Sequence, residues 1–347
     1  MKSDKPVLIL RFSAFGDIAM TAPVVRSYAL NYPHLTFVMV SAPLLEPLFS
    51  NISNLKFEGI DFKKYSGFWG LYRLYSRLRE YRPSIVLDLH QVLRTYVLCA
   101  LFFFFSVTLI FGVKKGRRQR RRLTKVNCKV LHPLPSMMKR YIDVFIRGGF
   151  PPISIDDIPI PKTSFPASHP PLPKNAPSLH IGIAPFAKHP TKEWPIEKME
   201  SVVTQLARNG KYRISLFGGG NVERDILKSW EQQYSNTLCV VGIFDFSREL
   251  SLIGGVDLFV CMDSANMHFA SFMGVPVLSI WGGTHPYAGF YGWRQAPENA
   301  IQADMTCRPC SVFGEKTCRL GTFACFQSIS VQQVLHRIEC FFEQKGV

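Results

Sequence analysis

The chain has 347 residues, of which 47% are hydrophobic and 19% charged, and this balance excludes a disordered protein. A chain of this length exceeds what one ordinary hydrophobic core holds, so we expect two domains. The 41 Lys and Arg residues against 25 Asp and Glu give a formal net charge of +16, which favours a polyanionic partner.

The first half of the chain alternates short apolar runs with helical segments. We expect strands at 7–10, 35–40 and 84–89, and helices at about 21–31 and 71–81, an alternation typical of parallel βαβ units. Asp17 follows the turn after the first strand, where it either caps the helix or acts as a general base on an acceptor hydroxyl. His90 follows a later strand and either contacts the acceptor or makes a structural hydrogen bond.

An uncharged segment of 18 residues, Tyr96 to Val113, is flanked by Arg94 and Lys114. Eighteen residues is the lower limit for spanning a bilayer. Ser106 interrupts the run, and its second half is β-branched, so we expect a buried helix followed by a buried strand. The alternatives are a membrane-facing patch beside the basic segment and a transmembrane helix. We expect the last one least, because both flanking regions predict parts of one sheet.

The positive charge is concentrated in residues 114–129, which contain nine Lys or Arg and no acid. One interpretation is a solvated basic loop. The other is a site for nucleic acid, anionic lipid headgroups or a phosphorylated acceptor. No aromatic residues are interleaved for stacking on bases, so we expect no nucleic acid. The candidate acceptor-binding cations are Lys114, Lys115, Arg117, Arg118, Arg120, Arg121 and Arg122.

Residues 151–177 are rich in Pro, which suits neither a helix interior nor a central strand, and we interpret them as an interdomain linker. The alternation then resumes, with strands expected at 180–184, 212–217, 238–241, 258–262 and 275–281, and helices at 196–209, 221–235, 247–253 and 330–345. The predicted fold class is α/β with two doubly wound, Rossmann-like domains. We expect an N-terminal domain at 1–160, a linker at 161–178, a C-terminal domain at 179–328 and a terminal helix at 329–347.

Polar or glycine-rich loops follow four strands of the second domain: 186–194, 218–220 with Glu223 on the next helix, 263–266, and 282–285. The carboxyl ends of parallel strands share one edge, and glycine turns before helices let backbone N–H groups approach phosphate. Each loop alone is also compatible with an ordinary turn, but together they favour a nucleotide diphosphate. Lys188 and Lys192 add positive charge, and we count Thr191 and Ser264 among the donor-binding candidates.

Nine Cys residues, an odd number, are scattered through the chain, which suits a reducing compartment. The apolar run at 7–10 is too short for a secretory signal. Four thiols cluster at Cys307, Cys310, Cys318 and Cys325. Because this cluster has only one close CxxC pair, we expect no metal, with zinc as a weaker alternative to free thiols or a facultative disulfide.

Three segments resemble motifs of glycosyltransferase family 9, the lipopolysaccharide heptosyltransferases. They are RFSAFGDIAMTAPVVRSY (11–28), PTKEWPIEKM (190–199) and DSANMHFASFMGVPVLSIWGGTHP (263–286), and the cysteine-containing tail also resembles many members. The resemblance implies a GT-B fold, in which two Rossmann-like domains face a cleft and the terminal helix crosses back to the first domain. It also implies inverting transfer of a sugar, usually heptose from ADP-heptose, to the lipopolysaccharide inner core.

The resemblance implies roles for six residues. It makes Asp17 the catalytic base, Lys192 a lysine beside the donor phosphate and sugar, and Asp263 the acid that holds the sugar hydroxyls. It brings Glu223 to the nucleotide ribose, and His268 and Thr284 to the donor phosphates. Ala265 replaces the family's usual glycine, which tolerates positive φ better, so the donor sugar stays open.

We therefore expect a metal-independent enzyme without a cofactor, in which Lys192, backbone N–H groups and the helix after Asp263 stabilise the leaving diphosphate. Its expected partners are a nucleotide-sugar donor and an anionic glycolipid acceptor. We expect a cytoplasmic monomer in peripheral contact with the inner membrane. The alternative is a non-catalytic nucleotide-sugar or glycan-binding protein on the same fold.

Overall fold

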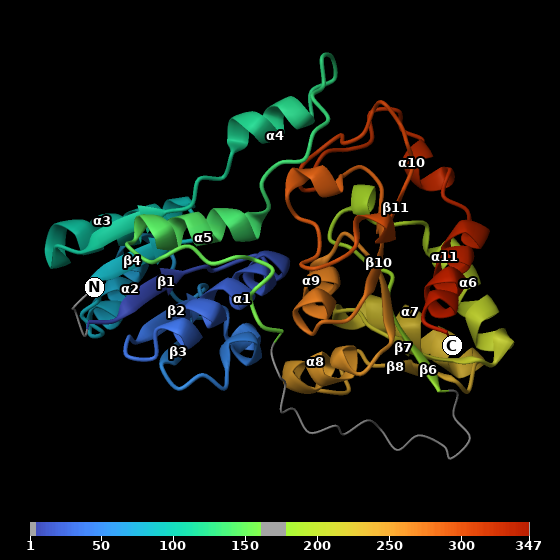
Figure 1. The fold of residues 1–347 in the computed structure, drawn as a ribbon, viewed down its shortest axis with the longest axis horizontal. Helices are drawn as coiled ribbons and strands as arrows, with labels where there is room; N and C mark the ends of the chain where they lie inside the picture. The colour runs from blue at the N-terminus through green and yellow to red at the C-terminus, as the bar shows by residue number, and fades with distance from the viewer. Residues whose placement is uncertain (1–4, 161–177, 347) are drawn as a thin grey trace. The chain divides into compact units, whose positions relative to one another are not determined.

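The computed structural model describes residues 5–160 and 178–346, which form two compact α/β units (Figure 1). Unit 1 comprises the described residues up to 115 together with 135–160, and unit 2 comprises 116–134 and the described residues after 160. The α/β class with two parallel sheets is therefore confirmed. Of the linker expected at 161–178, only residue 178 lies within the described residues.

Unit 1 contains a parallel five-stranded sheet in the order β3-β2-β1-β4-β5. Strands β1 and β2 are fully buried, as expected for apolar strands of a parallel sheet covered on both faces. The strand order reverses between β1 and β4, which is where open parallel sheets bind ligands. The elements are β1 (Val7–Leu10), α1 (Phe15–Asn31), β2 (Phe37–Ser41), the 3-10 helix η1 (Pro43–Phe49), β3 (Leu55–Gly59), α2 (Gly67–Arg79), β4 (Ile85–Asp88), α3 (Leu93–Ser106), β5 (Leu109–Gly112) and α5 (Met137–Arg147).

Unit 2 contains a parallel six-stranded sheet in the order β11-β10-β9-β6-β7-β8, whose order reverses between β6 and β9. Its elements are α4 (Arg117–Leu123), β6 (Leu179–Ala184), η2 (Pro190–Lys192), α6 (Ile196–Asn209), β7 (Tyr212–Leu216), α7 (Gly220–Gln233), β8 (Thr237–Cys239), α8 (Phe246–Gly254), β9 (Leu258–Met262), α9 (Ala265–Phe272), β10 (Val277–Trp281), η3 (Pro286–Ala288), η4 (Pro297–Asn299), β11 (Ala300–Gln302), α10 (Ala324–Gln327) and α11 (Val331–Gln344).

The terminal helix α11 clusters with unit 2, and the expectation that it crosses to the first domain stays a prediction. Val334, Ile338 and Phe342 are buried at a spacing of four residues, which places them on one face of the helix. That face packs on α6 and joins the core of unit 2, where the Phe342 ring lies 5.4 Å from the Tyr212 ring. The apolar face of the helix is thereby covered within its own unit.

Residues 116–134 also depart from the expected boundary at 160, because they cluster with unit 2 rather than with the residues around them. The basic segment is not a loop throughout, since α4 covers Arg117–Leu123. Arg120 and Leu123 are buried, and the Arg319 guanidinium donates to the Thr124 carbonyl. These contacts attach the segment to unit 2.

The segment 96–113 forms a helix followed by a strand, as predicted, but much of it is not buried. Phe102 lies in the core, whereas Phe103, Phe104 and Phe105 are exposed on the last turn of α3. Among the described residues no helix combines the length and the apolar character needed to cross a membrane.

Candidate functional site

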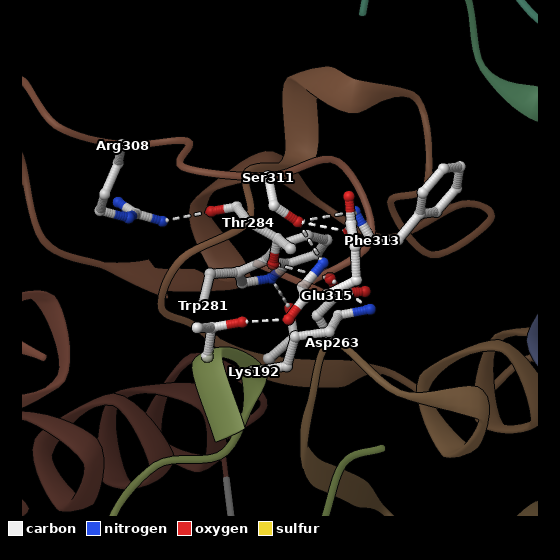
Figure 2. A network of polar contacts seen from close by, with 11 residues as sticks. Lys192, Asp263, Trp281, Thr284, Arg308, Ser311, Phe313 and Glu315 are labelled. Carbon is white, nitrogen blue, oxygen red and sulfur yellow. Dashed lines mark hydrogen bonds and ion pairs between the residues drawn. The ribbon is translucent and has the colours of Figure 1, made fainter. Parts of the chain in front are cut away.

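An ion pair lies where the strand order of the unit 2 sheet reverses. The loop after β6 ends in η2 with Lys192, and Asp263 follows β9 directly. The Lys192 ammonium Nζ is 2.9 Å from Asp263 Oδ2, and the Thr284 hydroxyl donates to the same oxygen at 2.7 Å (Figure 2). Because the side chains of Lys192 and Asp263 are only 17% and 5% exposed, water screens this pair weakly. Three predicted donor residues therefore form one cluster at a ligand-binding position.

Backbone contacts hold the two loops of this cluster together. The Gly283 N–H donates to the Thr191 carbonyl at 2.7 Å, and the Thr191 hydroxyl donates to the Gly314 carbonyl at 2.6 Å. A Cβ at Gly283 would lie 3.0 Å from Thr191 Cβ, so glycine permits this close approach. Thr191 thus serves as a structural anchor that positions Lys192.

A buried arginine, Arg308, organises the neighbouring loop (Figure 2). Its guanidinium donates to the carbonyls of Gly282 and Thr284 and to Gln302 Oε1, and also to the Ala303 carbonyl. Burial lowers the pKa of Arg308. We did not identify Arg308 in the sequence, because we considered only the cysteines on either side. The sequence feature that could have indicated a role for Arg308 is its charge, since the other residues of the CxxC segment are uncharged.

Glu223 occupies the amino end of α7, after the triple glycine. Its Oε2 accepts the Gly219 N–H at 2.7 Å, and burial raises the pKa of Glu223. A carboxylate is favourable at this end of a helix dipole. Since the Gly219 N–H is used by this carboxylate, the turn is better suited to a hydroxyl partner of Glu223 than to a phosphate.

The amino end of α9 lies beside the ion pair. Ser264 is the N-cap residue, and its Oγ is buried without a hydrogen-bond partner among the residues that the structure describes. Ala265 begins the helix and does not have positive φ, so glycine is not required there. His268 is buried one turn further along. Lys188, in contrast, is exposed and lies outside the cluster.

The site predicted in unit 1 lies at the corresponding reversal, after β1 and β4. Asp17 is in the first turn of α1, and its Oδ2 is 2.6 Å from the buried Arg11 Nη2. Arg11 also donates to the Leu89 carbonyl at 2.6 Å, which fixes the guanidinium. The N-cap of α1 is Ala14, so the interpretation of Asp17 as the N-cap is wrong. The Asp17 side chain is 22% exposed and remains accessible to a ligand.

His90 and Asp88 form a turn at the end of β4. Asp88 Oδ1 accepts the N–H groups of His90 and Gln91 at 2.9 and 2.8 Å, and burial raises the pKa of Asp88. Burial, together with nearby cations that include Arg11, lowers the pKa of His90 to about 3. His90 is therefore neutral at physiological pH and a poor general base.

The predicted acceptor-binding cations divide into two groups. Arg120 is buried, with its guanidinium carbon 4.5 Å from the Phe290 ring centroid and 5.7 Å from that of Phe313, so unlike most of the other candidates it is not exposed to an acceptor. Lys115 donates to the Gln91 carbonyl at 3.0 Å. The cations that are exposed are Lys114, Arg117, Arg118, Arg121 and Arg122.

The four clustered thiols do not assemble a metal site in the part of the chain that the structure describes, where no three or more His, Cys, Asp or Glu side chains lie close enough to hold an ion. Burial raises the pKa of Cys310 and of Cys325, which favours the thiol form. Arg308 and Lys129 lie among these residues, and Lys129 donates to the carbonyls of Thr306 and Arg308 at 2.9 and 2.7 Å.

The chain is similar to a known family over most of its length. The sequence model of glycosyltransferase family 9 (heptosyltransferase) matches residues 71–321, more than two thirds of the chain. The lipopolysaccharide core heptosyltransferase OpsX of Haemophilus influenzae is 23% identical over 315 residues, which cover 86% of this chain and 84% of that protein. Lipooligosaccharide heptosyltransferase 2 of Campylobacter jejuni is 23% identical over 167 residues, 46% of this chain and only half of that protein's length.

Solved structures show the same fold. The glycosyltransferase family 9 protein from Veillonella parvula has a TM-score of 0.73 at 20% identity and covers 99% of both chains. The heptosyltransferase WaaC of E. coli, solved with ADP-2-deoxy-2-fluoro heptose, has a TM-score of 0.64 at 17% identity and covers 96% of this chain and 99% of its own. The GT-B fold implied by the motifs is thus confirmed.

Proposed function

The chain belongs to glycosyltransferase family 9, and from that premise we propose that it transfers a heptose from ADP-heptose, with inversion, to an inner-core acceptor of lipopolysaccharide. The observation that carries this proposal is the pair of carboxylate sites at the two sheet reversals, Asp17 with Arg11 and Asp263 with Lys192. The heptose is supported by the family's description and by the analogue bound to WaaC.

The cluster in unit 2 is the donor side of the proposed reaction. Asp263 accepts from Lys192 and Thr284 through one oxygen, Oδ2, which leaves Oδ1 for the hydroxyls of the sugar. Negative charge develops on the diphosphate as its bond to the sugar breaks. Lys192 and the amino end of α9 supply positive charge at that place, and preorganised groups of this kind stabilise such charge strongly. In this proposal the Glu223 carboxylate accepts from a ribose hydroxyl.

Asp17 is the base of the proposed reaction. The acceptor oxygen forms a bond to the anomeric carbon while the bond from that carbon to the diphosphate oxygen breaks, and the hydroxyl proton passes to the Asp17 carboxylate. Arg11 orients this carboxylate through its 2.6 Å contact. His90 is unsuited to the step because the pKa of His90 is lowered to about 3.

The exposed cations of residues 114–122 suit an anionic glycolipid acceptor. We infer that the enzyme works as a monomer in the cytoplasm, in peripheral contact with the inner membrane, and needs neither metal nor cofactor. Metal independence is tested by treating the protein with a chelator, which should leave the transfer rate unchanged. A loss of activity that is restored by one added metal would refute it.

The deciding experiment replaces Asp17 by Asn. We expect the transfer rate to fall by about 10² to 10⁴, while ADP-heptose still raises the thermal stability of the variant by the normal amount. Asp143→Asn is the matched control, because Asp143 also pairs with an arginine in unit 1, at 3.0 Å within the same helix, and is not among the predicted site residues. An unchanged transfer rate in Asp17→Asn would refute the base role. Donor binding without transfer by the unmodified protein would instead support a binding protein.

A further inference from the structure

We propose that unit 1 docks on an anionic lipid bilayer through an aromatic patch on its surface. This inference rests on the proposed function, in which the acceptor is a glycolipid of the membrane. An enzyme that uses such an acceptor must work at the surface of a bilayer. The patch gives that contact a location away from the basic segment 114–129. It consists of six exposed aromatic residues on α2 and on the last turn of α3: Phe68, Trp69, Tyr72, Phe103, Phe104 and Phe105.

Contacts within and between the two helices connect several rings of the aromatic patch. Helices α2 and α3 pack against each other, and the Tyr75 ring lies 6.1 Å from Tyr72 on its own helix and 6.3 Å from Phe105 on α3. The Trp69 ring lies 5.7 Å from Phe68 and 6.4 Å from Tyr72. The residues of the patch are between 39% and 76% exposed, and Val107 and Leu109, which follow in the sequence, are exposed too. Clusters of exposed large apolar side chains mark interaction sites.

The sequence of α3 makes this exposure unavoidable. Successive residues of a helix point about 100° apart, so four consecutive Phe side chains cannot all face one core. Phe102 enters the core of unit 1, and the following three residues point outward. No described residue of unit 1 covers them, so folding alone does not require these side chains to be Phe.

The charge around the patch selects a bilayer as its partner. Residues 58–109 contain seven Lys or Arg against four acids, a net charge of +3, and two of the acids are buried, Asp88 and Glu58, which pairs with Arg77. Aromatic rings beside basic side chains are typical of surfaces that insert at the headgroup level of anionic membranes. A second copy of this chain would present the same positive charge to itself, which disfavours self-association through the patch.

Trp69 provides a native reporter for the test. It is 76% exposed, whereas the other four tryptophans, Trp194, Trp230, Trp281 and Trp293, are at most 5% exposed. A blue shift in emission on adding vesicles of phosphatidylcholine and phosphatidylglycerol therefore reports burial of Trp69. We expect this shift, quenching by lipids brominated in their acyl chains, and a much weaker effect with phosphatidylcholine alone.

The variant that tests the patch is Phe104→Ala with Phe105→Ala, two exposed positions where truncation leaves the core intact. We expect its partitioning to anionic vesicles to fall at least about tenfold. The matched control truncates two exposed apolar side chains elsewhere, Leu30→Ala with Val222→Ala, and should bind like the unmodified protein.

Several outcomes overturn the assignment. One is unaltered vesicle binding by the double variant, and another is sedimentation with vesicles without any change in Trp69 emission. A blue shift that grows with protein concentration in the absence of lipid, together with dimers in sedimentation analysis, would assign the patch to a second copy.

The proposed sugar transfer is tested separately. The Phe104→Ala, Phe105→Ala variant should transfer heptose normally to an inner-core oligosaccharide from which the lipid has been removed. Absence of transfer by the unmodified protein would refute the proposed function. The vesicle measurements would still show whether the patch binds an anionic bilayer.

Discussion

Replacing Lys192 by Met removes the positive partner of Asp263 and keeps much of the side-chain volume. The change leaves the Asp263 carboxylate, whose side chain is 5% exposed, with the Thr284 hydroxyl as its hydrogen-bond donor among the described residues. An uncompensated buried charge is strongly unfavourable, so the perturbation acts on stability as well as on donor binding.

The expected loss follows from the geometry. Breaking a buried pair by removing one partner costs about 3–5 kcal/mol. Two features reduce this loss. The Lys192 side chain is 17% exposed, so water reaches the ion pair, and the Thr284 hydroxyl still donates to Asp263 in the variant. We therefore expect the unfolding free energy to fall by about 2–3 kcal/mol. For a unit of this size the melting temperature should fall by about 4–12 °C. The transfer rate should fall by about 10²–10³, the effect of removing one preorganised donor to developing charge.

The assay is a double-mutant cycle in thermal and urea unfolding, with Lys192→Met, Asp263→Asn and the combination. The two substitutions together should destabilise by less than the sum of the single effects, with a coupling of about 1–2 kcal/mol. Lys188→Met is the matched control, because Lys188 lies four residues earlier on the same loop and is exposed. If the coupling is below about 0.5 kcal/mol, or if Lys188→Met has the same effect, the ion pair is not the organising contact of the site.

Three further predictions follow from buried or clustered charges. Burial, together with the nearby Asp245 carboxylate, raises the pKa of Glu249 to about 7. Between about pH 4.5 and 7 the native state therefore binds more protons than the unfolded state, and the protein loses stability as the pH rises through that range. Glu249→Gln should therefore raise the urea midpoint at pH 8 and leave it unchanged at pH 4, and equal midpoint shifts at both pH values would contradict this. Arg308→Met leaves four hydrogen-bond acceptors without this donor and should lower the unfolding free energy by at least about 3 kcal/mol in urea unfolding. A loss under about 1 kcal/mol would contradict the role given to Arg308. Replacing the exposed arginines of residues 117–122 by Ser should raise the KM for the acceptor and weaken the salt dependence of that KM, without changing the affinity for the donor. An unchanged KM in steady-state kinetics would show that this segment does not bind the acceptor.

Regular elements with complete local signals could be predicted almost to the residue. The helix 196–209 was predicted with its observed bounds, because it follows Pro195, has an amphipathic repeat and ends at Gly210, which takes a left-handed conformation. Strand β9 at 258–262 was equally clear as an uninterrupted apolar run. We missed β3, in which Lys56 and Glu58 alternate with apolar residues, because its pairing with β2 supplies the ordering that its own sequence lacks.

The candidate site was predictable where its residues follow apolar strands. Asp263 and Thr284 stand directly after such runs, and parallel topology then brings them to one edge of the sheet. Arg11 and Arg308 were not assigned. Both donate to backbone carbonyls that are distant in the sequence, such as Leu89 for Arg11, although Arg11 also pairs with the nearby Asp17. No local pattern encodes a partner 78 residues away.

Burial differs from the sequence pattern at two places for a common physical reason. The apolar run 96–113 predicted that Phe103–Phe105 would be buried, whereas they are exposed, and Arg120 is buried although it lies in a run of basic residues. Arg120 is buried because two aromatic rings, Phe290 and Phe313, compensate the loss of water around its guanidinium. The phenylalanines are exposed because a helix presents only one face to its core. Burial is therefore a property of neighbours rather than of single residues. Both exceptions have a structural consequence. Arg120 attaches the basic helix α4 to the loops beside the donor cluster. The exposed phenylalanines give unit 1 an aromatic surface that does not contribute to its own core.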